Sequence, residues 1–315
     1  MSAAVRVDRF RHEALLYGSA QEFLDGVVPF IRDGVRAGEP VLVVESPEKV
    51  AMLRGALGDD AGSVLFADMG EVGSNPARII PAWADFVSDQ GGAAQRMRGV
   101  GEPIWNGRSA AELVECQRHE SLLNVAFAGG PPWWLLCPYD TSQLGPDVIE
   151  EARRSHEFVT AGGKDRVSDD FRGVDACGAT LESPLPAPPA RTAAYAIDGD
   201  RLVGVRRAVS RFAVVRGLST ERATDLATAV NEVATNTVVH GGGKGTLRMW
   251  SSGGTVMCDV RDAGRYDTPL ADRERPAADA TGPGGLWLAN QLCDLVQIRV
   301  VDGGTVVRLH MRPDR

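Results

Sequence analysis

Three polar side chains share one face of a helix in the last third of the chain. The spacing of apolar residues over 220–239 predicts an amphipathic helix, on which Glu232, Asn236 and His240 occupy positions i, i+4 and i+8. At about 100° per residue these positions drift by only about 80° around the helix axis, so the side chains project from the rim of the apolar stripe. A carboxylate, an amide and an imidazole on one face can hold a polar ligand. Taken alone, the pattern is also typical of a solvated helix face.

A carboxylate lies at the end of a predicted strand further along the chain. Alternating apolar residues over 255–261 predict this strand, which leads into Asp262-Ala263-Gly264. An aspartate at a strand end can accept a hydrogen bond from the exocyclic amine of adenine, and the glycine permits close approach of the backbone. Asp-x-Gly is also a very common turn sequence, so the motif by itself is weak evidence for a nucleotide.

The third motif is a glycine-rich loop, Thr281-Gly282-Pro283-Gly284-Gly285, which leads directly into an apolar helix predicted over 286–293. The loop and the first helical turn present unpaired N–H groups and the positive end of the helix dipole, which attract anions such as phosphate. A loop that merely starts a helix can have the same composition. The phosphate-binding sequence GxxxxGK[ST] is absent from the chain, and no strand immediately precedes this loop, which disfavours a Rossmann fold.

In this order, the three motifs together resemble the N, G1 and G2 boxes of the Bergerat-fold ATPases, the superfamily of DNA gyrase, sensor histidine kinases and anti-sigma-factor serine kinases. The resemblance covers residues 195–313, and the run from Asn231 to Gly241 is most similar to the anti-sigma serine kinases. It implies ATP and Mg²⁺ as ligands. The implied roles are Mg²⁺ binding by Asn236, orientation or deprotonation of the attacking group by Glu232 as the catalytic residue, adenine selection by Asp262 in the box that contains Gly264, and phosphate binding by Gly282, Gly284 and Gly285.

The same resemblance implies a regulator that binds a sigma factor, the antagonist of an anti-sigma factor, or both, with Ser/Thr kinase activity on the antagonist. Residues 266–280 would form a mobile lid over the nucleotide. Two positions differ from the family pattern: the G1 box lacks a second glycine after Gly264, and Thr237 follows Asn236 where alanine is common. The first difference favours an alternative, a non-catalytic module that uses ATP to hold a binding-competent shape. A third alternative, an atypical sensor histidine kinase, needs a long helix with a phosphoacceptor histidine just before the ATPase domain, where this chain is proline-rich.

The predicted elements divide at that proline-rich stretch. Residues 183–190 contain four prolines, which favour an extended, semi-rigid spacer. We therefore place one domain at 8–172, a Gly/Pro-rich linker at 173–194 and the ATPase domain at 195–313. In the first domain, predicted helices, the last over 146–159, alternate with apolar runs, which predicts an α/β domain with a mainly parallel sheet. In the second, two helices precede two strands, a further helix and a hairpin, which predicts an α+β sandwich.

The first domain resembles the MEDS sensory domain, an α/β module related in fold to RecA-like ATPases. The resemblance rests on the run from His12 to Tyr17, Phe23, residues 38–44, Cys116 with His119-Glu120, and residues 137–140. Imidazole and thiolate suit soft and borderline cations, so His12, Cys116, His119 and Cys137 are candidates for the site of a metal or small-molecule signal. Cys116 and His119 share a helix face. The alternative is that these histidines cap or pair with charged groups and that both cysteines fill the core.

The composition limits the remaining functional classes. The chain has 315 residues and a formal net charge of −8, which argues against direct DNA binding because that binding needs a surplus of cations facing phosphates. No run approaches 18 consecutive apolar residues and no apolar leader is present, so we expect a cytoplasmic protein without a membrane segment. Five widely spaced cysteines without a CxxC motif suggest neither a disulfide framework nor a zinc ribbon.

Overall fold

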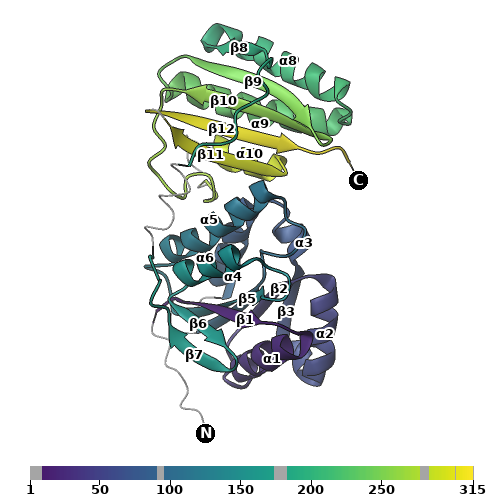
Figure 1. Ribbon diagram of the computed structural model, residues 1–315, viewed down its shortest axis with the longest axis vertical. Helices are drawn as coiled ribbons and strands as arrows, with labels where there is room; N and C mark the ends of the chain where they lie inside the picture. Colours follow the sequence, from purple (N-terminus) through teal and green to yellow (C-terminus); the bar gives the residue numbers. More distant parts are fainter. Residues whose placement is uncertain (1–8, 91–95, 174–182, 277–283, 302, 315) are drawn as a thin grey trace. The chain divides into compact units, whose positions relative to one another are not determined.

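The computed structural model describes residues 9–90, 96–173, 183–276, 284–301 and 303–314. The chain forms two compact units, Met1–Ala176 and Cys177–Arg315, each with its own sheet (Figure 1). Among the described residues, no helix has the length and apolar character needed to cross a membrane.

The first unit is built on a seven-stranded sheet. Its strands are β1 (Arg11–Tyr17), β2 (Val41–Glu45), β3 (Val64–Asp68), β4 (Met97–Gly101), β5 (Trp133–Asp140), β6 (Phe158–Ala161) and β7 (Lys164–Val167), in the order β3-β2-β4-β5-β1-β6-β7. Neighbouring strands are parallel except for β6 and β7, which form an antiparallel hairpin. The predicted α/β class with a mainly parallel sheet is therefore confirmed.

Helices cover both faces of this sheet, with α1 and α2 on one side and α4, α5 and α6 on the other (Figure 1). The helices are α1 (Ala20–Arg36), α2 (Pro47–Leu57), α3 (Met69–Val72), α4 (Ile79–Gln90), α5 (Ala110–Ala126) and α6 (Pro146–Ser155). Local sequence fixes where α5 begins, because Ser109 and Glu112 form a reciprocal capping box that satisfies two backbone N–H groups.

Two elements of the first unit differ from the sequence prediction. Strand β1 lies inside the sheet, between β5 and β6, although the sequence predicts no strand there. Its polar residues Arg11, His12 and Glu13 break the apolar pattern, yet all seven of its residues are buried. Helix α6 ends at Ser155 rather than at 159, because the chain turns at His156 and enters β6. The buried His12 therefore lies on β1, and the buried His156 lies between α6 and β6.

The second unit is a five-stranded antiparallel sheet with helices on one face (Figure 1). Its elements are β8 (Ala194–Ile197), α8 (Leu202–Val215), α9 (Thr220–Val239), β9 (Gly245–Ser252), β10 (Thr255–Asp262), α10 (Gly285–Leu292), β11 (Leu295–Val301) and β12 (Gly304–Met311), with the strand order β11-β12-β10-β9-β8. The core between sheet and helices contains Val209, Leu226, Val230, Cys258 and Leu309. The predicted α+β arrangement, including the terminal hairpin of β11 and β12, is confirmed.

The proline-rich segment that the sequence predicts as a spacer contacts the second unit. Arg308 on β12 forms an ion pair with Asp259 on β10, at 2.5 and 2.8 Å, on the face of the sheet opposite the helices. The Nη2 of Arg308 also donates a 2.9 Å hydrogen bond to the carbonyl oxygen of Pro186. Residues 184–188 therefore lie against this sheet, whereas the linker positions 174–182 are outside the described residues.

Candidate functional site

The acid and amide predicted on the ATPase helix meet the start of the next helix. Glu232 and Asn236 are half-buried on α9, which packs through Leu226 and Val230 on the sheet. Gly285, the first residue of α10, faces both: a Cβ placed on it would lie 3.2 Å from Oε2 of Glu232 and 3.3 Å from Nδ2 of Asn236. The N–H groups of the first turn of α10 have no partner within their own helix. A carboxylate, an amide and a helix N-terminus are thus brought together.

Asp262 is held in a fixed orientation at the end of β10. Its Oδ2 accepts a 2.6 Å hydrogen bond from the hydroxyl of Thr237, and its Oδ1 accepts a 2.8 Å bond from the N–H of Gly264. A carboxylate has about four acceptor sites, so these two bonds leave acceptor capacity for an amine donor. A Cβ on Gly241 would lie 2.5 Å from Cγ of Asp262, which only a glycine avoids. Gly264 thus contributes to this site through its backbone.

The structure describes one of the other two glycines of the predicted phosphate loop. Gly284 is the N-cap residue of α10, next to Gly285. Gly282 lies outside the described residues. His240, the third residue of the predicted helical face, is the exposed C-cap residue of α9. Thr237 was not predicted to act in the site, although it is one of the two positions that differ from the family pattern.

Hydrogen bonds connect part of the predicted lid to helix α10. In the described portion, 266–276, the hydroxyl of Tyr266 donates a 2.6 Å hydrogen bond to Oδ1 of Asp272. The Nδ2 of Asn290 on α10 donates a 2.9 Å bond to the carbonyl oxygen of Asp272. This part of the expected mobile lid is therefore tied to α10, and residues 277–280 lie outside the described residues.

Of the four predicted sensor residues in the first unit, the structure brings two together. His12 on β1 and Cys137 on β5 point to the same side of the sheet, with the Nε2 of His12 3.4 Å from the Sγ of Cys137. The thiol of Cys116 instead lies 3.4 Å from the carbonyl oxygen of Pro103. Successive helical residues point about 100° apart, so the face of α5 that brings Glu120 to His12 turns His119 elsewhere.

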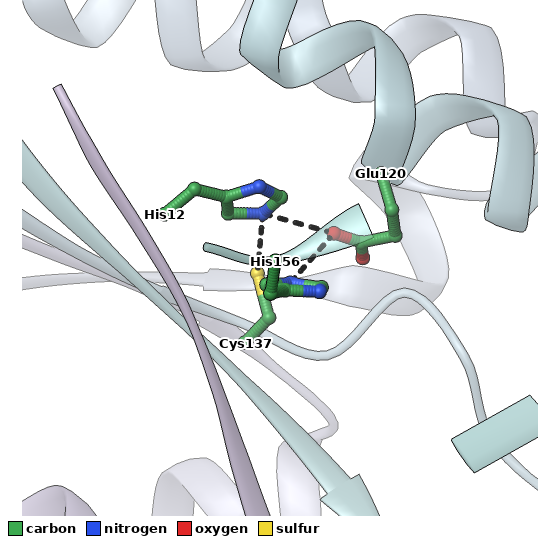
Figure 2. Close-up of side chains that lie close together, drawn as sticks. All are labelled: His12, Glu120, Cys137 and His156. Atoms are coloured by element: carbon green, nitrogen blue, oxygen red, sulfur yellow. Dashed lines mark hydrogen bonds and ion pairs between the residues drawn. The ribbon is translucent and has the colours of Figure 1, made fainter. Parts of the chain in front are cut away.

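Glu120 and His156 complete the buried cluster in place of Cys116 and His119 (Figure 2). The Nε2 of His12 lies 3.1 Å from Oε2 of Glu120, and the Nε2 of His156 lies 3.3 Å from the same oxygen. One potential ligand atom from each of the four side chains lies within 4.8 Å of the others. All four residues are at most 2% exposed. Glu120 directly follows His119, which the sequence indicated as a candidate. His156 was not a candidate, because the sequence predicts that it lies inside a helix that continues to 159.

Burial controls the protonation of this cluster. Removal from water, with His156 alongside, lowers the pKa of His12 to about 4, so its imidazole is neutral at pH 7. Burial, followed by the charge of Glu120, raises the pKa of the Cys137 thiol well above its usual range. Burial acts to raise the pKa of the Glu120 carboxyl, but its contacts with His12 and His156 outweigh burial and hold that pKa below its usual range. The cluster can thus carry a single carboxylate inside the core.

A separate hollow of about 380 Å³ opens at the carboxyl ends of the parallel strands. Glu45, at the end of β2, lines it and is 1% exposed, and its Oε1 has no hydrogen-bond partner within the part of the chain that the structure describes. Glu102, which follows β4, accepts a 3.0 Å hydrogen bond from Tyr17 and pairs with Lys49. Burial, then the charge of Glu102, raises the pKa of Glu45 well above its usual range. Open α/β sheets commonly bind ligands at this edge.

Two family models match this chain. Residues 11–157 match the MEDS model, the methanogen/methylotroph DcmR sensory domain, and residues 196–311 match the histidine kinase-like ATPase domain. No curated protein matches the chain. A solved structure with partial similarity is that of the RsbU and RsbW domains of Rv1364c from Mycobacterium tuberculosis, with 21% identity and a TM-score of 0.30 over 40% of this chain and 34% of that one. The chain therefore carries a MEDS domain followed by a histidine kinase-like ATPase domain.

Proposed function

We propose that this protein is a signal-responsive anti-sigma regulator that binds ATP and Mg²⁺ through its second domain. The observation that carries the proposal is the convergence of Glu232, Asn236 and the N-terminus of α10 around Gly285. A carboxylate and an amide, which both carry oxygens that suit a hard cation, lie there beside N–H groups that attract phosphate. The match to the histidine kinase-like ATPase domain supports the same ligand.

The proposed roles follow the chemistry of each side chain. Asn236 would hold Mg²⁺ through its amide oxygen, and Asp262 would accept from the adenine amine with the acceptor sites that Thr237 and Gly264 leave unused. Gly284 and Gly285, with Gly282 by sequence, would let backbone N–H groups approach the phosphates. Mg²⁺ would supply neutralisation of phosphate charge. A side chain at Gly285 would intrude between Glu232 and Asn236, so the residues present fit such a ligand.

Glu232 is the proposed catalytic residue, and a sigma factor or the antagonist of an anti-sigma factor is the proposed partner. Support for this partner is the similarity of the run from Asn231 to Gly241 to the anti-sigma serine kinases. On this proposal Glu232 orients or deprotonates a Ser or Thr hydroxyl of the antagonist in the cytoplasm. The missing second glycine after Gly264 supports a second candidate, a module that binds ATP and its partner without phosphotransfer.

The domain assignments are part of the proposal. We place the MEDS-type sensory domain at 8–172 with a RecA-like fold, which the parallel order β3-β2-β4-β5-β1 supports. The ATPase domain at 195–313 would be a Bergerat fold, which the helices α8 and α9, the antiparallel sheet and the position of α10 support. The signal would act on the first domain, either as a small molecule in the hollow beside Glu45 or as a metal ion.

Calorimetry of Mg-ATP with the full chain tests nucleotide binding. We expect Asn236→Ala and Asp262→Asn each to weaken binding at least ten-fold, while Asn231→Ala, on another face of the same helix, leaves it unchanged. Wild-type protein that binds no Mg-ATP at millimolar concentration would refute the proposal. A pull-down from native lysate with and without Mg-ATP then identifies the partner, and recovery of neither a sigma factor nor an antagonist would remove the anti-sigma assignment.

A further inference from the structure

The four buried side chains of Figure 2 come from four separate elements of the first unit. His12 lies on β1, Glu120 on α5, Cys137 on β5 and His156 immediately after α6. Imidazole nitrogen, carboxylate oxygen and thiolate sulfur are all ligands of borderline divalent cations. The charge and hydrogen bonds of the group decide whether it is a metal site or only a buried polar network.

Surrounding oxygen atoms fix the tautomers of both histidines. The Nδ2 of Asn124 donates a 2.8 Å hydrogen bond to the carbonyl oxygen of Ser155, so its Oδ1 is the atom 3.2 Å from the Nδ1 of His12. The Nδ1 of His156 lies 2.8 Å from the carbonyl oxygen of Ala152. Both of these oxygens can only accept, and the Ser155 hydroxyl, 3.1 Å from the Nδ1 of His156, donates to the carbonyl oxygens of Glu151 and Ala152, so each Nδ1 carries the proton. Such second contacts are typical of histidines that bind a metal through Nε2.

With Nδ1 protonated, a neutral imidazole presents a bare lone pair at Nε2. Both Nε2 atoms then face Oε2 of Glu120, which is itself an acceptor. The imidazole rings of His12 and His156 are only 3.9 Å apart between centroids, so protonation of both would place two cations in contact. Among the described residues, Oε1 of Glu120 has no hydrogen-bond partner. The group has more acceptors than protons, which a bound cation would correct.

We propose that His12, Glu120, Cys137 and His156 bind one borderline divalent metal ion, with Zn²⁺ the best match to the ligand set. A tetrahedral zinc site with ordinary bond lengths separates its ligand atoms by about 3.3–3.7 Å. Three of the separations, 3.1, 3.3 and 3.4 Å, are already close to that range. Small side-chain shifts would bring the remaining pairs, which are within 4.8 Å, into it.

The charge of the site selects a dication. One carboxylate and one thiolate balance two positive charges and leave a neutral group in the core, where an unbalanced charge would be costly. The metal would lower the pKa of the Cys137 thiol enough to deprotonate it. Four protein ligands fill a tetrahedral shell, so the site would join β1, β5, α5 and the end of α6 rather than activate a water molecule. The inference is independent of ATP binding by the second domain.

The experiment uses the purified full chain without a histidine tag, stripped with a chelator under reducing conditions and titrated with Co²⁺ and then Zn²⁺ in the absence of nucleotide. We expect one equivalent of Co²⁺, the absorption bands of four-coordinate cobalt, a near-ultraviolet thiolate-to-cobalt band, and displacement by Zn²⁺. Cys137→Ser should lose the thiolate band, and His156→Gln should weaken binding at least ten-fold. Cys116→Ser, a buried cysteine of the same unit outside the cluster, should retain both the band and the affinity.

Three results would overturn the proposal. They are a folded wild-type chain that binds neither metal stoichiometrically, a thiolate band that persists in Cys137→Ser, and a band that disappears in Cys116→Ser. Circular dichroism of each metal-free variant separates loss of ligand from loss of fold. If Cys137→Ser does not fold, the wild-type titration and Cys116→Ser still decide the question. Unimpaired Mg-ATP binding by chelator-treated protein would leave the proposed function of the second domain standing.

Discussion

The hydroxyl of Thr237 donates a 2.6 Å hydrogen bond to Oδ2 of Asp262, joining the last turn of α9 to the end of β10. Thr237 is fully buried, and it occupies a position at which the family that this domain resembles commonly has alanine. The bond connects the helix that carries Asn236 to the carboxylate proposed to select adenine. It orients Asp262 where Gly241 and Gly264 come close to the carboxylate. Thr237, although unusual for the family, therefore supports the site.

Replacement of Thr237 tests that relationship. We expect Thr237→Ala to weaken Mg-ATP binding by about three- to ten-fold, because one net hydrogen bond contributes about 0.5–1.5 kcal/mol. Thr237→Ser keeps the hydroxyl and should bind as the wild type does. Calorimetry measures both affinities. Equal binding by the alanine variant would show that Asp262 holds its orientation without Thr237.

A methyl group at Gly285 should damage the proposed nucleotide site without unfolding the domain. Its Cβ would lie 3.2 Å from Glu232 and 3.3 Å from Asn236, tighter than ordinary packing. We expect Gly285→Ala to reduce Mg-ATP affinity several-fold at an almost unchanged melting temperature.

The matched control is Gly204→Ala in α8, where an added Cβ meets nothing within 4 Å. This variant should bind Mg-ATP normally and gain about 0.4–1 kcal/mol of stability, because alanine restricts the unfolded chain. Normal nucleotide affinity in Gly285→Ala would mean that phosphates do not approach the start of α10.

Glu232→Gln separates binding from catalysis. The amide keeps the shape of the side chain but cannot take a proton, so we expect Mg-ATP binding to persist while phosphotransfer to the partner falls by about 10²–10⁴-fold. Transfer of radiolabelled phosphate to the recovered partner is the measurement. Equal phosphorylation by wild type and variant would exclude Glu232 as a general base, and absence of phosphotransfer in the wild type would favour the non-catalytic module.

The buried Glu45 should make the first unit less stable as the pH rises. Its folded-state pKa is raised by burial and by Glu102, against the opposing charge of Lys49. A group with a raised folded-state pKa contributes full stability below its unfolded pKa, and that contribution is lost as the pH rises toward the folded value. Glu45→Gln is uncharged throughout, so its melting temperature relative to wild type should increase from pH 5 to pH 8.

Thermal unfolding followed by tryptophan fluorescence at both pH values measures this difference, at about 2–4 °C for each kcal/mol in a unit of this size. Glu48→Gln, an exposed neighbour on α2, is the control and should show no such trend. A melting-temperature difference for Glu45→Gln that is the same at pH 5 and pH 8 would mean that the carboxyl titrates normally. The titratable neighbours Glu102, Tyr17 and Asp140 are the same residues in the wild type and in both variants.

The sequence by itself determined the candidate residues of the ATPase domain. Each of its motifs is a short continuous run whose local structure follows from its residues: an amphipathic helix with Glu232 and Asn236, a strand that ends at Asp262, and a glycine loop before an apolar helix. Helical and strand periodicity also predicted the classes of both sheets. Residues 232 and 285 are far apart in the chain, however, and only the fold places α10 against α9.

In the first unit the tertiary structure decided which residues meet. Helical periodicity relates the residues of α5 to one another but does not say which face contacts the sheet, so it could not choose Glu120 over Cys116 and His119. Strand β1 was not predicted because buried polar residues interrupt its apolar pattern, and most partners of those residues lie on other elements. His156 joins the cluster because the chain turns at the end of α6, and packing of the whole sheet, rather than local sequence preference, sets that turn.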